Sequence, residues 1–175
     1  MLSMRKVIYT IGHSNLDAKT FVSLLTKHSV EVLVDVRRFP TSKFEHFKSE
    51  NLKSILKEND IDYVWISELG GFRKRILKNS PNIAIKSEGF RNYADYMLTQ
   101  EFKQAISNLI EIAKNRIVAI MCAEKFYWRC HRKFIADYLT ILGFEVRHII
   151  DNNVKVHKLS KYARIVGDTV IYNKI

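Results

Sequence analysis

Five short apolar runs in this sequence are each followed by residues whose side chains could bind or transform a ligand. If the runs are strands of a parallel sheet, their carboxyl ends meet at one edge, which is where such folds bind ligands. One such exit would mean little, but five together suggest a site. The exits are Gly12-His13-Ser14, Asp35-Val36-Arg37, Leu69-Gly70-Gly71-Phe72-Arg73, Cys122-Ala123-Glu124 and His148-Ile149-Ile150-Asp151.

Cys122 and Glu124 follow the most apolar run, residues 117–121. A cysteine there can act as a nucleophile if a neighbouring cation stabilises its thiolate, and His131 or Arg132 could do so. Glu124 could act as a general base that activates water. We therefore predict that both residues are catalytic, although Cys122 could instead be a small residue of the core.

His13, Asp35 and Arg37 supply further chemistry at the first two exits. His13 could transfer a proton near neutral pH. Asp35 could orient His13 or Arg37, or act as a general base, so we predict that His13 and Asp35 are catalytic. The guanidinium of Arg37 suits a phosphate or carboxylate, but Asp35 and Arg37 could also form a structural ion pair.

The other predicted binding residues lie in the loops beside these exits. Glycine allows a ligand to approach the backbone closely, and serine can contact a ligand or cap the next helix. The aromatic segment 126–128 is flanked by basic residues, and an exposed ring there could stack on a base. With Arg37, the predicted binding residues are Gly12, Ser14, Gly70, Gly71, Arg73, Trp128, His131 and Arg132.

The glycines of the sequence do not follow the spacing of a P-loop or of a dinucleotide-binding fingerprint, so we expect no cofactor. Cys122, Cys130, His131 and His13 could together hold zinc, but their spacing is not that of a standard zinc site. The two cysteines also lack the Cys-x-x-Cys spacing of a redox pair. We expect no bound metal.

The elements that must position these residues alternate along the chain, as in an α/β fold. The order predicts a single-domain, open and mainly parallel sheet flanked by helices over residues 1–151. Residues 152–175 form a C-terminal extension, in which Gly167-Asp168 could turn an antiparallel hairpin packed on the same domain. Predicted strands span 7–11, 32–36, 63–66, 117–121 and 145–150, and predicted helices span 17–28, 49–59 (capped by Ser49), 90–98, 101–115 and 129–142 (ended by Gly143).

The charge of the chain favours a phosphate-bearing partner. The 175 residues include 29 Lys and Arg but 18 Asp and Glu, a net charge of +11. Residues 73–91 hold six basic side chains and one acidic, and residues 125–133 hold four basic and none acidic. Such clusters beside the predicted site favour nucleic acid or a phosphate-bearing small molecule.

Composition excludes several other classes of protein. With 47% hydrophobic residues the chain is not disordered, and two cysteines cannot build a disulfide scaffold. The sequence has no secretory signal and no apolar run long enough to cross a membrane. We therefore expect a cytoplasmic protein with no membrane partner, and the oligomeric state is left open.

Several of these segments together resemble the domain-of-unknown-function family 488. They are Thr10-Ile11-Gly12-His13-Ser14, Asp35-Val36-Arg37, Leu69-Gly70-Gly71, Cys122-Ala123-Glu124 with Cys130-His131-Arg132, and Phe90-Arg91-Asn92-Tyr93-Ala94-Asp95-Tyr96-Met97. The resemblance covers about residues 7–151. It implies an α/β fold, and no secure activity for the family as a whole.

Charge and site chemistry favour an enzyme that acts on nucleic acid or a nucleotide. Hydrolysis, including base excision, is the most economical reaction because it needs no redox cofactor. Two alternatives stay open. The protein could be a non-catalytic nucleic-acid-binding module, or a small-molecule enzyme that uses Cys122 as its nucleophile.

Overall fold

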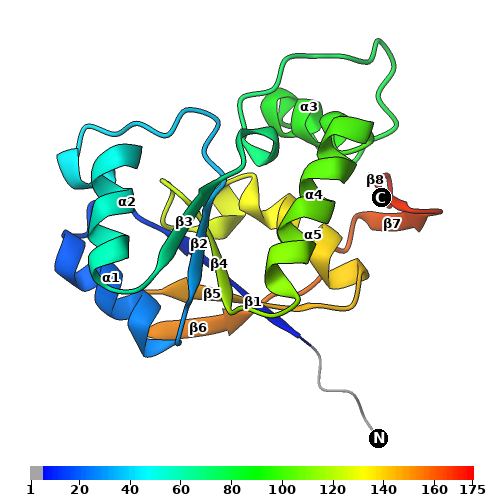
Figure 1. The fold of residues 1–175 in the computed structure, drawn as a ribbon. Coiled ribbons are helices and arrows are strands. Elements are labelled where there is room, and N and C mark those ends of the chain that lie inside the picture. The colour runs from blue at the N-terminus through cyan, green and yellow to red at the C-terminus, as the bar shows by residue number, and fades with distance from the viewer. Residues whose placement is uncertain (1–5) are drawn as a thin grey trace, which may run out of the picture.

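Short, β-branched and apolar strands form the centre of the fold, because a parallel sheet covered on both faces buries both sides of each strand. The computed structural model describes residues 6–175 (Figure 1). The first five strands are parallel, and β6 pairs antiparallel with β5. The sheet has the order β3-β2-β4-β1-β5-β6, with β1 Val7–Gly12, β2 Val32–Asp35, β3 Asp62–Trp65, β4 Val118–Cys122, β5 Glu145–Ile150 and β6 Asn153–Val156.

Five amphipathic helices cover the two faces of this sheet. Their apolar residues form two buried clusters, one under α1 and α2 and the other under α3, α4 and α5. The predicted open, mainly parallel α/β sheet is confirmed. The helices are α1 Ala18–Lys27, α2 Ser49–Glu58, α3 Glu88–Tyr96, α4 Gln100–Ala113 and α5 Arg132–Ile141.

Strands β1 and β4 are neighbours whose following helices lie on opposite faces of the sheet. The chain leaves β1 toward α1 and leaves β4 toward α5. Gly12 lies in close contact with the loop after β4, because a Cβ atom there would be 1.8 Å from the carbonyl oxygen of Glu124. Such a divergence of loops at the carboxyl edge is where open α/β sheets bind ligands.

The C-terminal segment contains two hairpins. Asp151, with φ of 51°, lies in the turn from β5 to β6, so residues 153–156 extend the main sheet. Strands β7 (Ala163–Val166) and β8 (Thr169–Tyr172) form a separate antiparallel sheet around Gly167 and Asp168, as predicted. Tyr172 of β8 is buried against the α3, α4 and α5 side.

Two helix starts differ from the prediction. Ser49 is the first residue of α2 and does not cap it, since the N-cap is Lys48, which makes no side-chain cap bond. Helix α5 begins at Arg132, because residues 127–129 form a 3-10 turn before it. The predicted helix end at Gly143 is confirmed by its φ of +97°.

Within residues 6–175, no helix is both long enough and apolar enough to cross a bilayer. Met1–Arg5, on which the expectation about a secretory signal partly rests, lie outside the described residues.

Candidate active site

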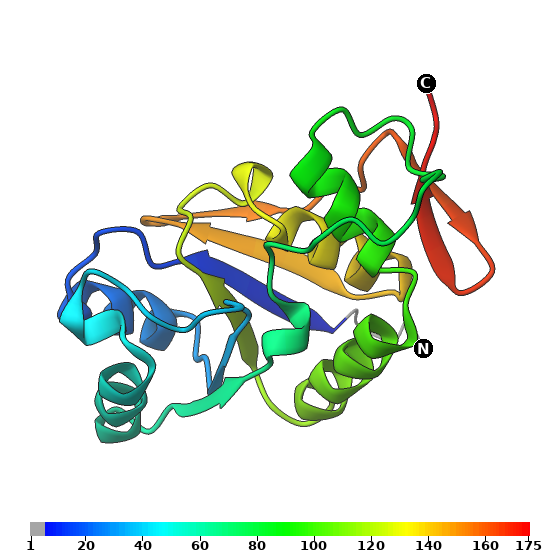
Figure 2. The same ribbon diagram turned by 90° about the horizontal axis from the view of Figure 1, so that it is seen from above.

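A cavity of about 520 Å³ lies at the carboxyl edge of the sheet. Figure 2 looks onto the molecule from above and shows the loops that enclose this edge. Six of the predicted site residues line the cavity, namely Arg37, Gly71, Arg73, Cys122, Glu124 and His131. The cavity therefore joins side chains from three of the five strand exits.

The two cysteines lie together at the base of this cavity. Their Sγ atoms are 2.8 Å apart, and both side chains are buried and unoxidised. Arg132, the first residue of α5, donates from Nε to Cys122 Sγ at 3.0 Å. Its backbone N–H points to Cys130 Sγ at 3.5 Å. A helix start and a buried guanidinium thus both favour negative charge on the thiol pair.

The pKa shifts of the two thiols favour negative charge on Cys130 over Cys122. Burial raises the pKa of Cys130, but the hydrogen bond from Cys122 and the charge of Arg132 outweigh burial and lower it to about 6. Burial and the hydrogen bond to Cys130 raise the pKa of Cys122 well above its usual value. These opposite shifts favour the Cys122 S–H as the donor to the sulfur of Cys130.

His131 lies beside Cys130 and faces its sulfur with a nitrogen that can accept the proton of that thiol. Its Nε2 is 2.9 Å from the carbonyl oxygen of Val36, and because a carbonyl only accepts, Nε2 carries the proton. Nδ1 is then an acceptor, 3.4 Å from Cys130 Sγ. Gly71 packs against this ring, since a Cβ there would come within 3.1 Å of Nδ1.

Arg132 is held in place by a directed chain of buried hydrogen bonds. Its Nη1 donates to Thr10 Oγ1 at 3.0 Å, and the same oxygen lies 2.6 Å from Nδ1 of His148. Nε2 of His148 lies 2.8 Å from Nδ1 of His157. His157 in turn donates from Nε2 to the carboxylate of Asp137 at 2.7 Å. Because a carboxylate only accepts, a neutral His157 accepts at Nδ1 from His148, and His148 then accepts at Nδ1 from the Thr10 hydroxyl.

The carboxylate of Asp137 closes the chain by accepting two further bonds. It accepts from the Tyr172 hydroxyl at 2.9 Å and from the Ser160 backbone N–H at 3.1 Å. Tyr127 stacks on His148 with ring centroids 3.5 Å apart. Among the described residues, no buried side-chain nitrogen or oxygen lacks a hydrogen-bond partner. The C-terminal hairpin thereby supports Arg132 through a fully bonded network.

Glu124 is the carboxylate of the cavity. Its side chain is half-buried, and Oε1 accepts from the backbone N–H of Phe126 at 3.2 Å. Its own carbonyl oxygen accepts from Arg132. The backbone is therefore fixed while one carboxylate face remains available to a water molecule or a substrate.

His13, Asp35 and Arg37 form a second cluster on the α1 and α2 side. Arg37 Nη2 lies 2.7 Å from Asp35 Oδ2, and both side chains are buried. Nη1 of Arg37 donates to the carbonyl of Phe47 at 2.7 Å and lies 3.5 Å from Nε2 of His13. Tyr63 donates to Asp35 at 2.6 Å. Asp35 and Arg37 therefore form the buried ion pair that the sequence analysis gave as one of two alternatives.

This second cluster does not contact the thiol pair. Alternate residues of a strand point to opposite faces, so Cys122 packs against the α5 side while Asp35 faces α1 and α2. His13 stacks on Phe47 at 4.2 Å. Burial lowers the pKa of His13 to about 4, which leaves the ring neutral at pH 7. Only Arg37 of this cluster reaches the cavity wall.

The rim of the cavity is basic and aromatic. Arg38, Arg73 and Arg129 line it, and Phe39 and Phe72 are 62% and 86% exposed. Arg73 is partly engaged, since it donates to the carbonyls of Ser67 and Gly70 and stacks on Tyr96 at 3.9 Å. Exposed rings between cations are the combination that binds a base and its phosphate.

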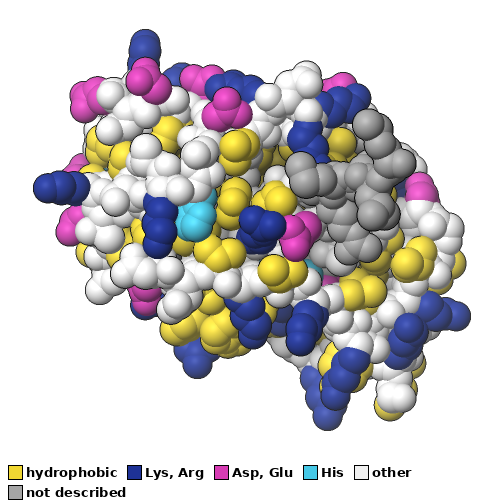
Figure 3. Space-filling view, turned by 90° about the horizontal axis from the view of Figure 1, so that it is seen from below, with side chains coloured by type: hydrophobic (Ala, Val, Ile, Leu, Met, Phe, Trp, Pro, Cys, Tyr) yellow, Lys and Arg dark blue, Asp and Glu magenta, His cyan; other side chains and the backbone are white. Residues whose placement is uncertain are grey.

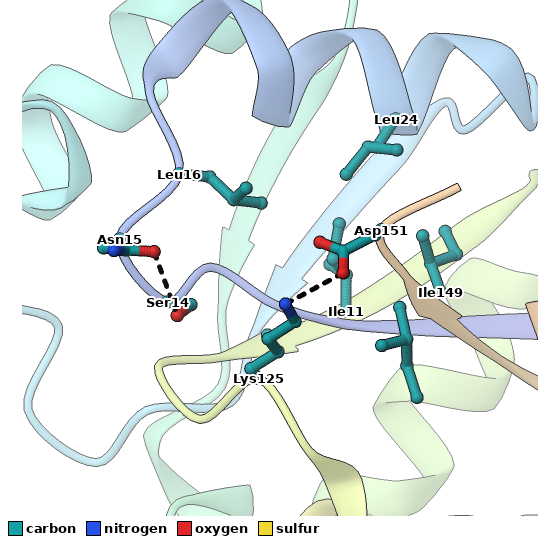
Figure 4. Close-up of a pocket in the computed structure, with 10 residues that line it drawn as sticks. Ile11, Ser14, Asn15, Leu16, Leu24, Lys125, Ile149 and Asp151 are labelled. Carbon is teal, nitrogen blue, oxygen red and sulfur yellow. Dashed lines mark hydrogen bonds and ion pairs between the residues drawn. The ribbon is translucent and has the colours of Figure 1, made fainter. Parts of the chain in front are cut away.

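The remaining predicted binding residues lie elsewhere. Gly12 and Ser14 line a space of only about 20 Å³ that Lys125 and Asp151 close with a 2.8 Å ion pair (Figure 4). Trp128 is exposed but faces a separate depression beside His157.

Gly70 and Arg132 have structural roles. Gly70 lets the loop after β3 pack on the loop after β2, since a Cβ would come within 2.5 Å of the Arg38 backbone. Arg132 is buried and bonded within the protein. Neither residue lines the cavity.

Positive charge is not confined to the cavity. On the face seen from below, Lys and Arg side chains lie among hydrophobic ones, with a few Asp and Glu side chains between them (Figure 3). In residues 6–175, no group of three or more His, Cys, Asp or Glu side chains could hold a metal ion.

Sequence reasoning left out several residues that build the site. The sequence does carry a signal for Cys130, because it lies two residues before Arg132, a basic residue at the start of a helix. Phe39 and Phe72 flank basic residues in the loops. Thr10, Asp137 and His157 carry no local signal, since their partners are far apart along the chain.

The sequence model described as "Domain of unknown function DUF488" matches residues 17–139. The chain belongs to the DUF488 family. The matched region of this DUF488 protein contains the Asp35–Arg37 pair and both cysteines, while Thr10, His148 and His157 lie outside it. Comparisons with curated proteins and with solved structures gave no match.

We expect this DUF488 protein to lose stability in mild acid. Burial lowers the pKa of both His13 and His148 from 6.5, so the unfolded chain binds more protons than the folded one once the pH drops below about 6.5. Their contribution is fully present above pH 6.5 and is lost as the pH falls toward the folded pKa. Between pH 7.5 and pH 5, each should reduce the free energy of unfolding by about 2 kcal/mol.

Urea unfolding at the two pH values, followed by circular dichroism, measures this difference. In His148→Gln the pH-dependent loss should shrink by about 2 kcal/mol, because glutamine does not titrate. An unchanged pH dependence in that variant would contradict the assignment.

Proposed function

We propose that this DUF488 protein is an enzyme that hydrolyses nucleic acid or a nucleotide in the cavity at the carboxyl edge of β4. The observation that carries the proposal is the composition of the cavity. One carboxylate, Glu124, lies within a ring of arginines and exposed phenylalanines. Its volume of about 520 Å³ falls within the range of small-molecule sites.

The residues divide into binding and chemical roles. Arg38 and Arg129 would hold phosphate, and Phe39 or Phe72 would stack on a base. Glu124 would act as the general base that takes a proton from water. Removal of a base from an unpaired nucleotide fits this set of groups, because the attacking water needs only an oriented carboxylate.

Binding tests the proposal directly. We expect a short single-stranded oligonucleotide to bind with an affinity that falls roughly 20-fold from 50 to 200 mM salt, as about three phosphate contacts would require. Arg38→Gln and Arg129→Gln should each reduce the slope of log Kd against log salt by about 0.7, the value of one phosphate contact on a single strand. Fluorescence anisotropy measures both quantities.

Lys53→Gln and Lys57→Gln provide a matched control. These exposed lysines line a depression beside the first residues of β2 and β3, at the opposite edge of the sheet. They should leave the salt slope unchanged. If the lysine variants lower the slope and the arginine variants do not, the proposed binding surface is wrong.

A second candidate function follows from the thiol pair. The lowered pKa of Cys130, caused by the hydrogen bond from Cys122 and the charge of Arg132 acting against burial, favours covalent catalysis by this thiolate on a small molecule. This reading predicts rapid alkylation of Cys130 by iodoacetamide at pH 7 and loss of activity in Cys130→Ser. Slow alkylation that begins only after denaturation would exclude it.

A further inference from the structure

The thiol pair has a geometry that hydrolysis does not require. Cys122 and Cys130 are the only two cysteines of the chain, and their sulfur atoms are already 2.8 Å apart. A disulfide needs roughly 2.05 Å, so less than about 1 Å of further approach separates the thiols from a bond. Both side chains also line the cavity, so a small oxidant could reach them.

We propose that Cys122 and Cys130 form a redox-active dithiol that reduces hydroperoxides and is itself converted to a disulfide. Cys130 is the attacking residue and Cys122 the resolving one. The two roles follow from the surroundings of each sulfur, and they do not rest on the proposed hydrolysis.

The surroundings favour negative charge on Cys130 and a retained proton on Cys122. The S–H of Cys122 and the backbone N–H of Arg132 both point to Cys130 Sγ. Peroxides react with thiolates and not with thiols, so the attack falls on Cys130. The side-chain Nε of Arg132, 3.0 Å from Cys122, then favours ionisation of the second thiol.

The reaction balances without a further reactant. The thiolate of Cys130 attacks one peroxide oxygen, an S–O bond forms and the O–O bond breaks. The leaving alkoxide or hydroxide takes up the proton that Cys130 released when it ionised. The resulting sulfenic acid loses its hydroxyl when Cys122 attacks the same sulfur. The proton of Cys122 leaves with that hydroxyl as water. In sum, the dithiol and an organic hydroperoxide give a disulfide, an alcohol and one water molecule. With hydrogen peroxide the products are a disulfide and two water molecules.

Buried hydrogen bonds keep the pair aligned for this chemistry. Arg132 cannot turn away from Cys122, because Thr10 and two carbonyl groups accept its other N–H groups. The position of its guanidinium is thus fixed before the peroxide enters. Because Arg132 is held in this way, the contact between the two cysteines is part of an ordered site and not an accidental contact.

Thiol counting tests the proposal. The reduced full-length protein is freed of reductant, treated with one equivalent of hydrogen peroxide, and titrated in denaturant with Ellman's reagent. We expect the two thiols to be lost together, and dithiothreitol to restore both. Oxidation of the four methionines does not affect this count.

Variants assign the roles of the two cysteines. Cys122→Ser should stop at the sulfenic acid, which dimedone traps on Cys130, while the wild type gives no adduct. Cys130→Ser should consume peroxide at least a hundredfold more slowly. Cys122→Ala and Cys130→Ala serve if a serine variant fails to fold by circular dichroism.

Two results would overturn the proposal. One is a wild-type protein that keeps both thiols after exposure to equimolar peroxide. The other is a Cys130 variant that consumes peroxide at the wild-type rate. Because no oligonucleotide enters these assays, they can fail while the proposed hydrolysis holds, and the reverse.

Discussion

Glu124→Gln is expected to lower the rate of hydrolysis by a factor of about 10² to 10⁴, the usual contribution of a general base. Glutamine has almost the same shape, and its side-chain oxygen can still accept from the backbone N–H of Phe126. The substitution removes only the ability to take a proton from water. The fall should therefore appear in kcat.

Binding should respond differently. Because Glu124 lies among Arg38, Arg73 and Arg129, removing its negative charge should leave KM for a phosphate-bearing substrate unchanged or lower. Glu58→Gln is the matched control, since Glu58 is exposed at the end of α2. If Glu124→Gln keeps wild-type kcat while Cys130→Ser abolishes activity, the second candidate function replaces the first.

Asp35→Ala is expected to destabilise the protein by about 3–5 kcal/mol. The side chain of Asp35 is fully buried and holds the guanidinium of Arg37 through Nε and Nη2. Its removal leaves a positive charge buried without a counter-charge and takes the acceptor from the Tyr63 hydroxyl. The free energy of unfolding in urea measures the effect.

A double variant separates this charge effect from simple loss of packing. Asp35→Leu with Arg37→Met replaces the ion pair by apolar side chains, so the buried charge disappears from both residues. It should recover most of the stability that Asp35→Ala loses. If the double variant is as unstable as the single one, the pair is not held by its charges, and the account of this cluster is wrong.

The positions of the strand ends were predictable, because the local pattern of apolar residues is enough to locate each strand. Apolar runs such as 117–121 identify buried strands, and parallel strands place their exits at one edge of a sheet. Gly143 and the turn at Gly167-Asp168 were equally local signals, and both are confirmed. The cavity follows from these elements.

The sequence did not predict which face of the sheet each residue at the end of a strand would point to. That face depends on the pleat, and a shift of one residue at a strand end moves a side chain to the other face. Asp35 and Cys122 both end strands, yet they pack against different helices. His13 and Asp35 therefore lie in a cluster apart from the thiols.

The hydrogen bonds that hold Arg132 in place could not be predicted from the sequence either. They continue through Thr10 and His148 to His157 and Asp137, which lie on different segments of the chain. Residues 153–156 gave no strand signal because all four side chains are exposed, so no buried face shapes their pattern. In both cases tertiary contacts, not local propensity, decide the outcome.

Binding of nucleic acid in the cavity beside Glu124 is the central claim made for this protein. A crystal structure of Glu124→Gln with a bound single-stranded oligonucleotide tests that claim directly, because this variant should bind without turnover. We expect a base stacked on Phe39 or Phe72, a phosphate on Arg38 or Arg129, and the scissile bond beside residue 124. An oligonucleotide bound over β6 and the C-terminal hairpin, with the cavity empty, would contradict the account.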